Sequence, residues 1–395
     1  MPAAPGDIDV TALKARADAA MGTADFRRAA DLLGEATALA PGRLDLWLAR
    51  AAALRAAGDF PNALEAVDRG LAVDPRSFPA LLMKASLMER LGAPHGAGAA
   101  YGVALTQAPP EAEMPPPMRT AFAHARQVHE RYQDELARSL KAGLGDRPAG
   151  PTARRLETFI DRLAGRRRAF HPEPVQFHYP GLPELEFHDR ERFPGLGVLE
   201  AATPDIRAEL AAVLNEDAGG LEPYIDYRDD VPLDQWAELN RSPAWSAYHL
   251  WKDGVRVEEH ARRCPRTMAA IANLPQPRAP GRSPAAMFSV LKPRTRIPPH
   301  VGVANTRLVM HLPLIVPPRC GFRVGSETRS WKVGEAWVFD DTVEHEAWND
   351  SDEVRVVLIC DVWNPYLADE ERELITRVMA AMDAFSGAAP PGDGL

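Results

Sequence analysis

Two kinds of hydrophobic spacing divide the chain. Over residues 9–110, apolar positions rich in Ala and Leu recur every three to four residues, as they do on the buried face of a helix. Residues 118–142 and 152–168 have a similar pattern. After about residue 284 the apolar runs become short or alternating, and clusters of Pro, Gly, Asn and Asp separate them, which is typical of strands and turns. Because 395 residues also exceed the usual size of one core, we expect a multidomain protein with an all-α first part and a β-rich second part.

The first part contains an internal repeat of 34 residues. Three prolines recur at this interval: Pro41, Pro75 and Pro109. The pair Asp25-Phe26 returns in the same register as Asp59-Phe60. A period of 34 residues is that of the tetratricopeptide repeat, a pair of helices whose second helix ends before a proline that cannot continue the hydrogen-bond ladder. The sequence therefore predicts tetratricopeptide-like repeats over residues 8–110 and a helical linker over residues 111–175.

Stacked repeats of this kind usually present a concave surface that binds a peptide or a protein. Docking of a peptide or protein substrate is therefore one expected role for residues 8–110. The alternative is that three repeats only stabilise the next domain or a dimer, and the sequence leaves both roles open.

The β-rich part is predicted to form a jelly roll. Five strands are expected, at residues 286–291, 307–316, 321–324, 336–339 and 354–363. Many short strands favour a sandwich or barrel, and a double-stranded β-helix of the jelly-roll or cupin kind, with flanking helices, fits residues 176–385. The open end of such a fold is a natural cavity for a metal ion and a small ligand.

Composition narrows the range of partners. A net charge of -9 and a pI near 5.7 argue against a nucleic-acid surface. No run of about 18 apolar residues is present, which argues against a membrane span. The first residues lack the basic and apolar segments of a secretory signal, and three cysteines are too few for a disulfide framework. We expect a cytoplasmic protein that binds neither nucleic acid nor membrane.

Two histidines and an arginine are the candidate chemical groups. His300 and His345 both fall beside turns at the edges of expected strands. Two imidazoles from different strands are the nitrogen ligands of many non-haem iron sites, although histidines 45 residues apart are more often unrelated. The strand expected at residues 354–363 is apolar on both faces over its first half except for Arg355, and a buried guanidinium needs an anion. A dicarboxylate that chelates iron at one end would leave its other carboxylate for Arg355.

The expected strand at residues 307–316 places two polar side chains together. Its alternation sets Leu308, Met310, Leu312 and Leu314 on one face. Arg307 and His311 lie on the other face. That second face is either exposed to water or part of a polar cavity.

These segments together resemble a known family. They are Phe288–Val290, His300–Gly302, Arg307–His311, Phe339–Asp341, His345–Trp348 and Asp361–Pro365, with a weaker likeness at Trp245–Trp251. In their order and spacing they resemble the aspartyl/asparaginyl β-hydroxylases, which are Fe(II)- and 2-oxoglutarate-dependent dioxygenases. The similarity covers roughly residues 180–370, and tetratricopeptide-type helices ahead of this domain are a known arrangement in the family.

The resemblance implies a reaction and a set of site residues. The reaction would be hydroxylation of an aspartyl, asparaginyl or similar side chain of a peptide or protein. His300 and His345 match the iron-binding histidines. Ser289, His311 and Arg355 match positions that hold 2-oxoglutarate, with Arg355 at its distal carboxylate. Asp341 and Glu346 also fall in the motif and are expected to support the ligands or the structure.

The chain departs from the family pattern at two positions. Val309 stands where the family usually has an arginine, and Arg307, one step further along the same face, is the candidate to replace it. Asn364 stands where the closing motif usually has a histidine. Gly302 offers no carboxylate, as in the animal-type protein hydroxylases and unlike the lipid-hydroxylating relatives, which favours a protein substrate. An open position there could also admit chloride, as in iron halogenases, but the surrounding motif is of the hydroxylase kind.

Two other functions stay open at this point. The chain could be a repeat scaffold whose jelly roll has lost turnover. It could also be a regulator that binds iron or 2-oxoglutarate without reacting.

Overall fold

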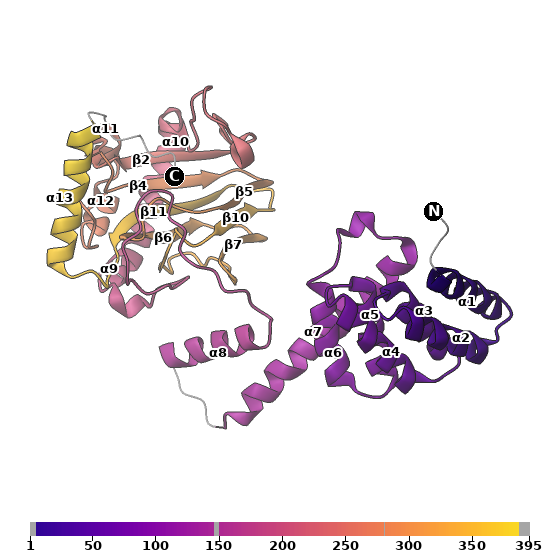
Figure 1. Ribbon diagram of the computed structural model, residues 1–395. Coiled ribbons are helices and arrows are strands. Elements are labelled where there is room, and N and C mark those ends of the chain that lie inside the picture. The colour runs from indigo at the N-terminus through magenta and orange to yellow at the C-terminus, as the bar shows by residue number, and fades with distance from the viewer. Residues whose placement is uncertain (1–4, 146–149, 280, 387–395) are drawn as a thin grey trace. The chain divides into compact units, whose positions relative to one another are not determined.

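The structure is a computed structural model that describes residues 5–145, 150–279 and 281–386 (Figure 1). It divides into two compact units, Met1–Arg167 and Arg168–Leu395. The first unit is helical and the second is built on two antiparallel sheets with flanking helices. The predicted multidomain fold class is thus confirmed.

In its described residues, the helical unit consists of three helix pairs followed by a short 3-10 helix and two further α-helices. The pairs are α1 (Pro5–Gly22) with α2 (Phe26–Leu39), α3 (Leu44–Ala56) with α4 (Phe60–Val73), and α5 (Phe78–Arg90) with α6 (Pro94–Leu105); a short 3-10 helix (Glu111–Glu113), α7 (Pro116–Gly143) and α8 (Pro151–Leu163) follow. Each 34-residue period is one pair, and its proline lies beyond the second helix of that pair.

The repeated residues explain why the helices begin where they do. Asp25 caps α2 by accepting a hydrogen bond from the backbone N–H of Arg28 (3.2 Å). Asp59 caps α4 in the same way through the N–H of Asn62 (3.3 Å). A side-chain cap of this kind satisfies one of the backbone donors that every helix leaves unpaired at its start. In the third pair Ala93 occupies the cap position and provides no such bond.

The described residues of the second unit form eleven strands in two sheets. They are β1 (Glu222–Pro223), β2 (Trp245–Lys252), β3 (Val255–Arg256), β4 (Ala286–Leu291), β5 (Thr295–His300), β6 (Arg307–Ile315), β7 (Cys320–Val324), β8 (Glu327–Arg329), β9 (Trp337–Phe339), β10 (His345–Asn349) and β11 (Arg355–Trp363). The major sheet has the order β1-β2-β4-β11-β6-β9, with β3 paired to β2. The minor sheet has the order β5-β10-β7-β8.

The pairing of the last eight strands is that of a jelly roll. β4 pairs with β11, β5 with β10, β6 with β9 and β7 with β8, so the first strand of the series pairs with the last and the pairs close inward. This pairing alternates between the two sheets and wraps the chain as a double-stranded β-helix.

The helices of this unit flank the sheets. They are α9 (Leu196–Ala201), α10 (Thr203–Glu216), α11 (Glu258–Arg263), α12 (Pro265–Ile271) and α13 (Asp369–Ser386). α9, α10 and α12 contribute buried side chains to a core on the outer face of the major sheet (Figure 1). Among the described helices of the chain, none combines the length and the apolar character that crossing a bilayer requires.

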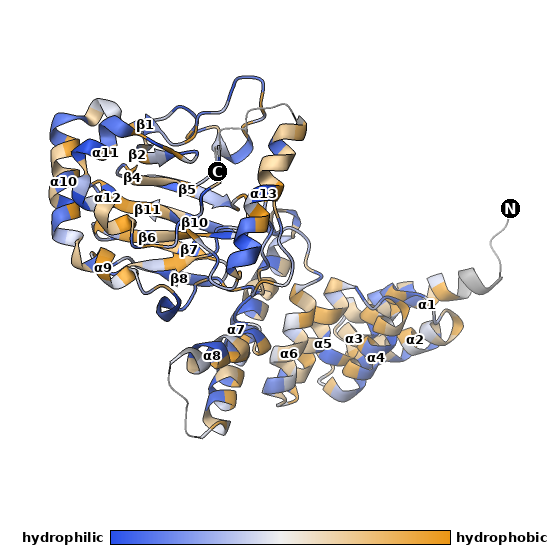
Figure 2. Ribbon diagram, turned by 90° about the vertical axis from the view of Figure 1, so that its left-hand side faces the viewer, coloured by the Kyte–Doolittle hydropathy of each residue, from blue (hydrophilic) through white to orange (hydrophobic). Residues whose placement is uncertain are grey.

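The major sheet buries both of its faces. Its central strands β4, β11 and β6 are largely hydrophobic in Figure 2, and their side chains are buried along most of their length. Leu308, Met310, Leu312 and Leu314 point to the helices. Val309 instead joins a second core between the two sheets, and His311 on the same face is also buried. The polar face of β6 therefore lines the interior and not the solvent.

Two strands important for the site are not among the five predicted from periodicity. β5 contains Pro298 and Pro299, which cannot donate to a ladder, and it lies at the edge of the minor sheet, where prolines are tolerated. β10 alternates buried and half-buried positions, but three of its five residues are the polar His345, Glu346 and Asn349. Its alternation is therefore hidden from a reading of hydrophobicity alone.

Candidate active site

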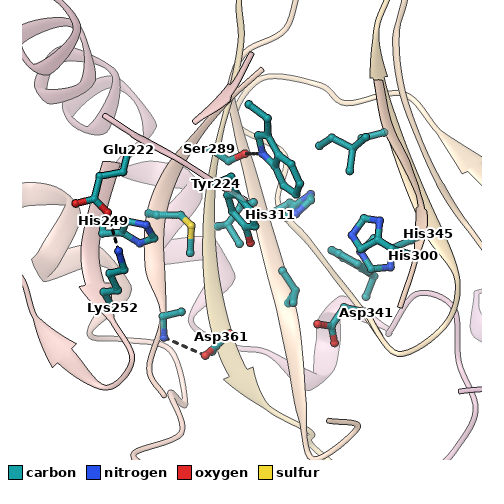
Figure 3. Close-up of a pocket in the computed structure, with 18 of the residues that line it drawn as sticks. Glu222, Tyr224, His249, Lys252, Ser289, His300, His311, Asp341, His345 and Asp361 are labelled. Carbon is teal, nitrogen blue, oxygen red and sulfur yellow. Dashed lines mark hydrogen bonds and ion pairs between the residues drawn. The ribbon is translucent and has the colours of Figure 1, made fainter. Parts of the chain in front are cut away.

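A cavity of about 540 Å³ lies between the two sheets of the second unit (Figure 3). The six residues predicted to bind the metal or 2-oxoglutarate all line it: Ser289, His300, Arg307, His311, His345 and Arg355. The minor sheet contributes the two candidate metal ligands, and the major sheet contributes the other four.

The two histidines meet because they are opposite each other on neighbouring strands. His300 ends β5, His345 begins β10, and the two residues are direct partners in the antiparallel register. Their ring centroids are 4.0 Å apart. A separation of 45 positions along the chain thus becomes a contact between side chains.

Backbone carbonyls fix the tautomer of both rings. The Nδ1–H of His300 donates to the carbonyl of Pro298 (2.7 Å), and the Nδ1–H of His345 donates to the carbonyl of Val343 (3.1 Å). A carbonyl can only accept, so the proton resides on Nδ1 and the lone pair on Nε2. This is the arrangement that metal-binding histidines usually have.

Both imidazoles are neutral at ordinary pH. Burial lowers the pKa of His345 to about 4. Burial also lowers the pKa of His300 well below its ordinary value, and the neighbouring His345 adds to this effect. Two neutral nitrogen donors with unprotonated Nε2 atoms fit a divalent metal such as Fe(II). In the described part of the chain no further His, Cys, Asp or Glu joins them to make a ligand group of three.

Asp341 occupies the space beside Gly302, two residues after His300. The backbone N–H of Gly302 donates to the carbonyl of Asp341 (2.7 Å), and a Cβ atom at position 302 would overlap with the Asp341 carboxylate. Gly302 is therefore required by close packing, since any side chain would displace Asp341. Asp341 lies toward the same end of the cavity as the two histidines (Figure 3), but its carboxylate is paired with Arg307 and does not join them as a third ligand.

Arg355 is a buried cation on the opposite wall. It is only 2% exposed, its guanidinium lies over the ring of Trp331 (4.8 Å to the centroid), and Nε has no hydrogen-bond partner. No carboxylate of the described residues forms an ion pair with it. Burial lowers the pKa of Arg355 to about 10, so the group is still charged at neutral pH. A buried charge without a counter-ion is unfavourable, which indicates that this position is built for an anion.

Ser289 and His311 flank Arg355 on the neighbouring strands. The Ser289 hydroxyl accepts a hydrogen bond from Trp245 Nε1 (3.1 Å), which leaves its own O–H available as a donor. His311 is buried, and its Nδ1 has no partner. Burial lowers the pKa of His311 well below its ordinary value, and the charge of Arg355 adds to the shift.

Arg307 lines the same cavity but is already paired with carboxylates. Its Nη1 lies 3.0 Å from Asp341 Oδ2 and 3.6 Å from Asp361 Oδ1. Val309, where the family usually has an arginine, also lines the cavity. The replacement of that arginine by Arg307 stays a prediction, because the structure places its guanidinium on two aspartates.

Three residues near the site carry roles that sequence reasoning did not assign. Trp331 stacks on Arg355, Trp245 donates to Ser289, and Asp361 pairs with Arg307. Trp245 and Asp361 lie within the segments that resemble the family, and this was the available signal. Trp331 lies outside those segments, and nothing in its surrounding sequence marks it.

The far end of the cavity has a different character. Glu222, Lys252 and His249 lie there, away from the histidine pair (Figure 3). Lys252 forms an ion pair with Glu222 (2.6 Å), and both side chains are about half exposed. The cavity therefore runs from a buried end, where His300 and His345 lie, to a more polar and more open end.

Comparison with known proteins agrees with this geometry. The family model described as aspartyl/asparaginyl beta-hydroxylase matches residues 200–365, and a tetratricopeptide repeat model matches residues 44–87. The ornithine lipid ester-linked acyl 2-hydroxylase of Rhizobium tropici is 34% identical over 196 residues, which cover 49% of this chain and 66% of that protein. The human aspartyl/asparaginyl beta-hydroxylase is 35% identical over 149 residues, which cover 38% of this chain and 19% of that protein.

A third relative is matched over more of its length. The aspartate beta-hydroxylase domain-containing protein 1 of Bos taurus is 31% identical over 267 residues, which cover 62% of this chain and 70% of that protein. The chain thus spans less than two thirds of the first two relatives and more than two thirds of the third. On these matches, the chain belongs to the aspartyl/asparaginyl β-hydroxylase family and has tetratricopeptide repeats in its N-terminal part.

Proposed function

We propose that the protein is an Fe(II)- and 2-oxoglutarate-dependent dioxygenase that hydroxylates an aspartyl, asparaginyl or similar side chain of a peptide or protein. One observation carries the proposal. Across a single cavity, two neutral imidazoles with unprotonated Nε2 atoms face a buried guanidinium that has no counter-ion among the described residues.

The minor sheet would hold the metal. His300 and His345 would bind Fe(II) through Nε2, and their bonds to backbone carbonyls keep both rings in the required tautomer and orientation. When bound, the iron supplies the activation of O2 that couples decarboxylation of 2-oxoglutarate to hydroxylation of the substrate. Only two protein ligands leave several coordination positions for 2-oxoglutarate, O2 and water.

The major sheet would hold the cosubstrate. Arg355 would bind the distal carboxylate of 2-oxoglutarate, ideally through two parallel N–H···O bonds, which also supplies the missing counter-ion. The Ser289 hydroxyl and the His311 ring are the next available polar groups on this wall. Trp331 would keep the guanidinium in place by stacking on it.

The apolar and aromatic residues of the cavity would exclude water from the reacting atoms. Phe322 and Phe339 pack around His311 and His345, with ring centroids between 4.8 and 6.0 Å apart. The rings of Trp236 and His300 pack in an edge-to-face arrangement, with their centroids 5.1 Å apart. A dry enclosure of this kind prevents side reactions and strengthens the electrostatic contacts inside it.

The substrate would enter from the open end that Glu222 and Lys252 line. The half-exposed ion pair there is the weak surface kind, worth at most about 1 kcal/mol, so polar groups of a bound peptide can replace it at little cost. The relatives include proteins named for aspartyl/asparaginyl and for lipid hydroxylation. The absence of a carboxylate at Gly302 leads us to propose a peptide or protein substrate, with the tetratricopeptide repeats as a docking surface for it.

The test is oxygen-dependent release of succinate from 2-oxoglutarate by the full chain with Fe(II), first alone and then with Asp- or Asn-containing peptides. Turnover that requires Fe(II) and O2 and is lost in His345→Ala would support the proposal. Metal and 2-oxoglutarate binding without turnover, even with peptides, would favour a regulator. Absence of both binding and turnover would favour a repeat scaffold.

A further inference from the structure

Two buried aspartates share one guanidinium in the lining of the cavity. Arg307 lies within 3.0 Å of Asp341 and 3.6 Å of Asp361, and both carboxylates are almost fully buried. Burial raises the pKa of each carboxyl, and the charge of Arg307 opposes that shift. When both carboxylates are ionised, two carboxylates and one guanidinium have a net negative charge, and burying such a charge is unfavourable.

The two aspartates are held very differently. Asp361 is anchored: its Oδ2 accepts hydrogen bonds from the Ser283 hydroxyl (2.9 Å) and from the backbone N–H of Ala285 (3.0 Å). Asp341 Oδ2 is held by Arg307, while its Oδ1 is buried and has no hydrogen-bond partner among the residues that the structure describes. The chain of contacts therefore runs from a fixed backbone point through Asp361 and Arg307 to Asp341.

Of these three residues, Asp341 is the one that lies toward the proposed metal-binding end of the cavity (Figure 3). Its carboxylate fills the space that a side chain at Gly302 would need, next to His300. Because Asp341 Oδ1 has no partner, the carboxylate can still accept a hydrogen bond there. Its orientation relative to the histidine pair depends on where Arg307 is held.

We propose that Asp361 is a positioning residue: by holding Arg307, it fixes the Asp341 carboxylate beside Gly302 at the end of the cavity where His300 and His345 meet. This inference rests on the proposed metal site and deepens it. Asp361 itself does not touch the metal or its ligands. Its loss lets Arg307 and Asp341 move together, and metal affinity falls although both histidines are intact.

The test uses Co(II) as the probe, because its affinity and its visible absorption spectrum report on the environment of the metal without any turnover. Asp361→Asn keeps the size of the side chain and an oxygen acceptor for Ser283 and Ala285, but it removes the charge that faces Arg307. We expect Asp361→Asn and Asp341→Asn each to weaken Co(II) binding by about tenfold, at the lower end of what loss of a supporting residue around a metal ligand costs. The two variants should show the same altered Co(II) spectrum.

Coupling between the two positions distinguishes positioning from a merely structural role. The double variant Asp341→Asn/Asp361→Asn should bind Co(II) no more weakly than Asp341→Asn alone, since both changes act through one contact chain. Asp352→Asn, an exposed aspartate paired with Arg294, is the matched control and should leave affinity and spectrum unchanged. If the two effects multiply, or if Asp361→Asn lowers the melting temperature with an unchanged Co(II) spectrum, the proposal is overturned.

A second variant keeps the test usable if Asp361→Asn does not fold. Ser283→Ala removes one of the two bonds that anchor Asp361, and we expect a two- to threefold loss of Co(II) affinity with a smaller spectral change of the same kind. No change in either quantity would contradict the proposal. Co(II) binding that does not depend on His300 or His345 would instead overturn the proposed metal site, and this inference with it.

Discussion

The two sheets that enclose the cavity contribute opposite kinds of chemistry. The minor sheet supplies two neutral rings whose Nδ1 protons are already satisfied by backbone carbonyls. The central strands of the major sheet supply Arg355, a buried charge without a counter-ion. The first arrangement is stable as it stands, because each ring has one partner and presents one lone pair. The second is incomplete until an anion binds.

Because of this difference, we expect substitutions on the two sides of the cavity to affect different ligands. Changes in the minor sheet should affect metal binding and leave the fold intact. Changes at Arg355 should affect binding of a dicarboxylate. They should also alter the stability of the unliganded protein, because an unpaired buried charge destabilises that state.

The largest expected effect comes from breaking the minor-sheet pair. His345→Ala and His300→Ala should each lower metal affinity and oxygen-dependent succinate release by at least about a hundredfold, since only two protein ligands are present. Metal binding can be measured by titration with Mn(II), and turnover by succinate formation. His171→Ala, an exposed histidine paired with Glu184, is the control that should retain both. Full metal affinity in either variant would contradict the assignment of His300 and His345 as metal ligands.

The next largest effect is expected at Arg355 on the major sheet. Arg355→Met should raise the dissociation constant for 2-oxoglutarate by about a hundredfold while metal affinity stays close to that of the parent, because a charge-assisted bidentate pair is worth roughly 2–3 kcal/mol. The same variant should raise the free energy of unfolding of the unliganded protein by about 1–3 kcal/mol, as it replaces an unpaired buried charge by an apolar side chain. Chemical denaturation with and without 2-oxoglutarate measures both changes. A less stable unliganded variant would show that Arg355 has an internal partner.

Acid should weaken the sheet-bearing unit through its neutral buried histidines, and His188 isolates one of them. Burial lowers the pKa of His188 to about 4, and neither ring nitrogen has a hydrogen-bond partner. The folded pKa lies below the unfolded one, so the unfolded state binds more protons as the pH falls from about 6.5 towards 4. The contribution of His188 is therefore fully present above about pH 6.5 and is lost below it, by up to roughly 3 kcal/mol. His188→Phe should flatten the fall in unfolding free energy over this range, and an unchanged pH profile would contradict the assignment.

Gly302 tests the packing between the two walls. Gly302→Ala should lower the free energy of unfolding by about 1–3 kcal/mol, because its Cβ would overlap with the Asp341 carboxylate. The double variant Gly302→Ala/Asp341→Ala should recover most of that loss, since the overlapping atoms are gone. If the single substitution is neutral, Asp341 does not occupy this space in solution.

The smallest expected effect is in the helical unit, and it should not change ligand binding to either sheet. Asp59→Ala removes the side-chain cap of α4 and should lower the stability of that unit by about 1 kcal/mol. Metal and 2-oxoglutarate affinities should not change. A change in either would indicate that the repeats influence the site.

The helical repeats could be predicted from the sequence because their signals are local. Each period repeats the same terminating proline at an interval of 34 positions, and the first two periods also share the cap residue, so one pattern predicts the three helix pairs. The buried strands β4, β6 and β11 were predicted with similar success, since runs of apolar residues mark them.

The site was only partly predictable, because its contacts are not local. Periodicity alone did not reveal β5 and β10, and their register is what brings His300 and His345 together. The family resemblance named those residues, but it did not reveal that Arg307 is held by Asp361, or that Trp331 stacks on Arg355. Such contacts join positions that no short segment contains, so only the folded chain reveals them.

The most direct test of the account is anaerobic equilibrium binding of Mn(II) and 2-oxoglutarate to the parent chain, to His300→Ala/His345→Ala and to Arg355→Met. We expect the histidine variant to lose both ligands, because 2-oxoglutarate needs the metal as well as the arginine. We expect the arginine variant to keep Mn(II) and to lose most of its affinity for 2-oxoglutarate. Unchanged 2-oxoglutarate binding in Arg355→Met, or unchanged Mn(II) binding without the two histidines, would contradict it.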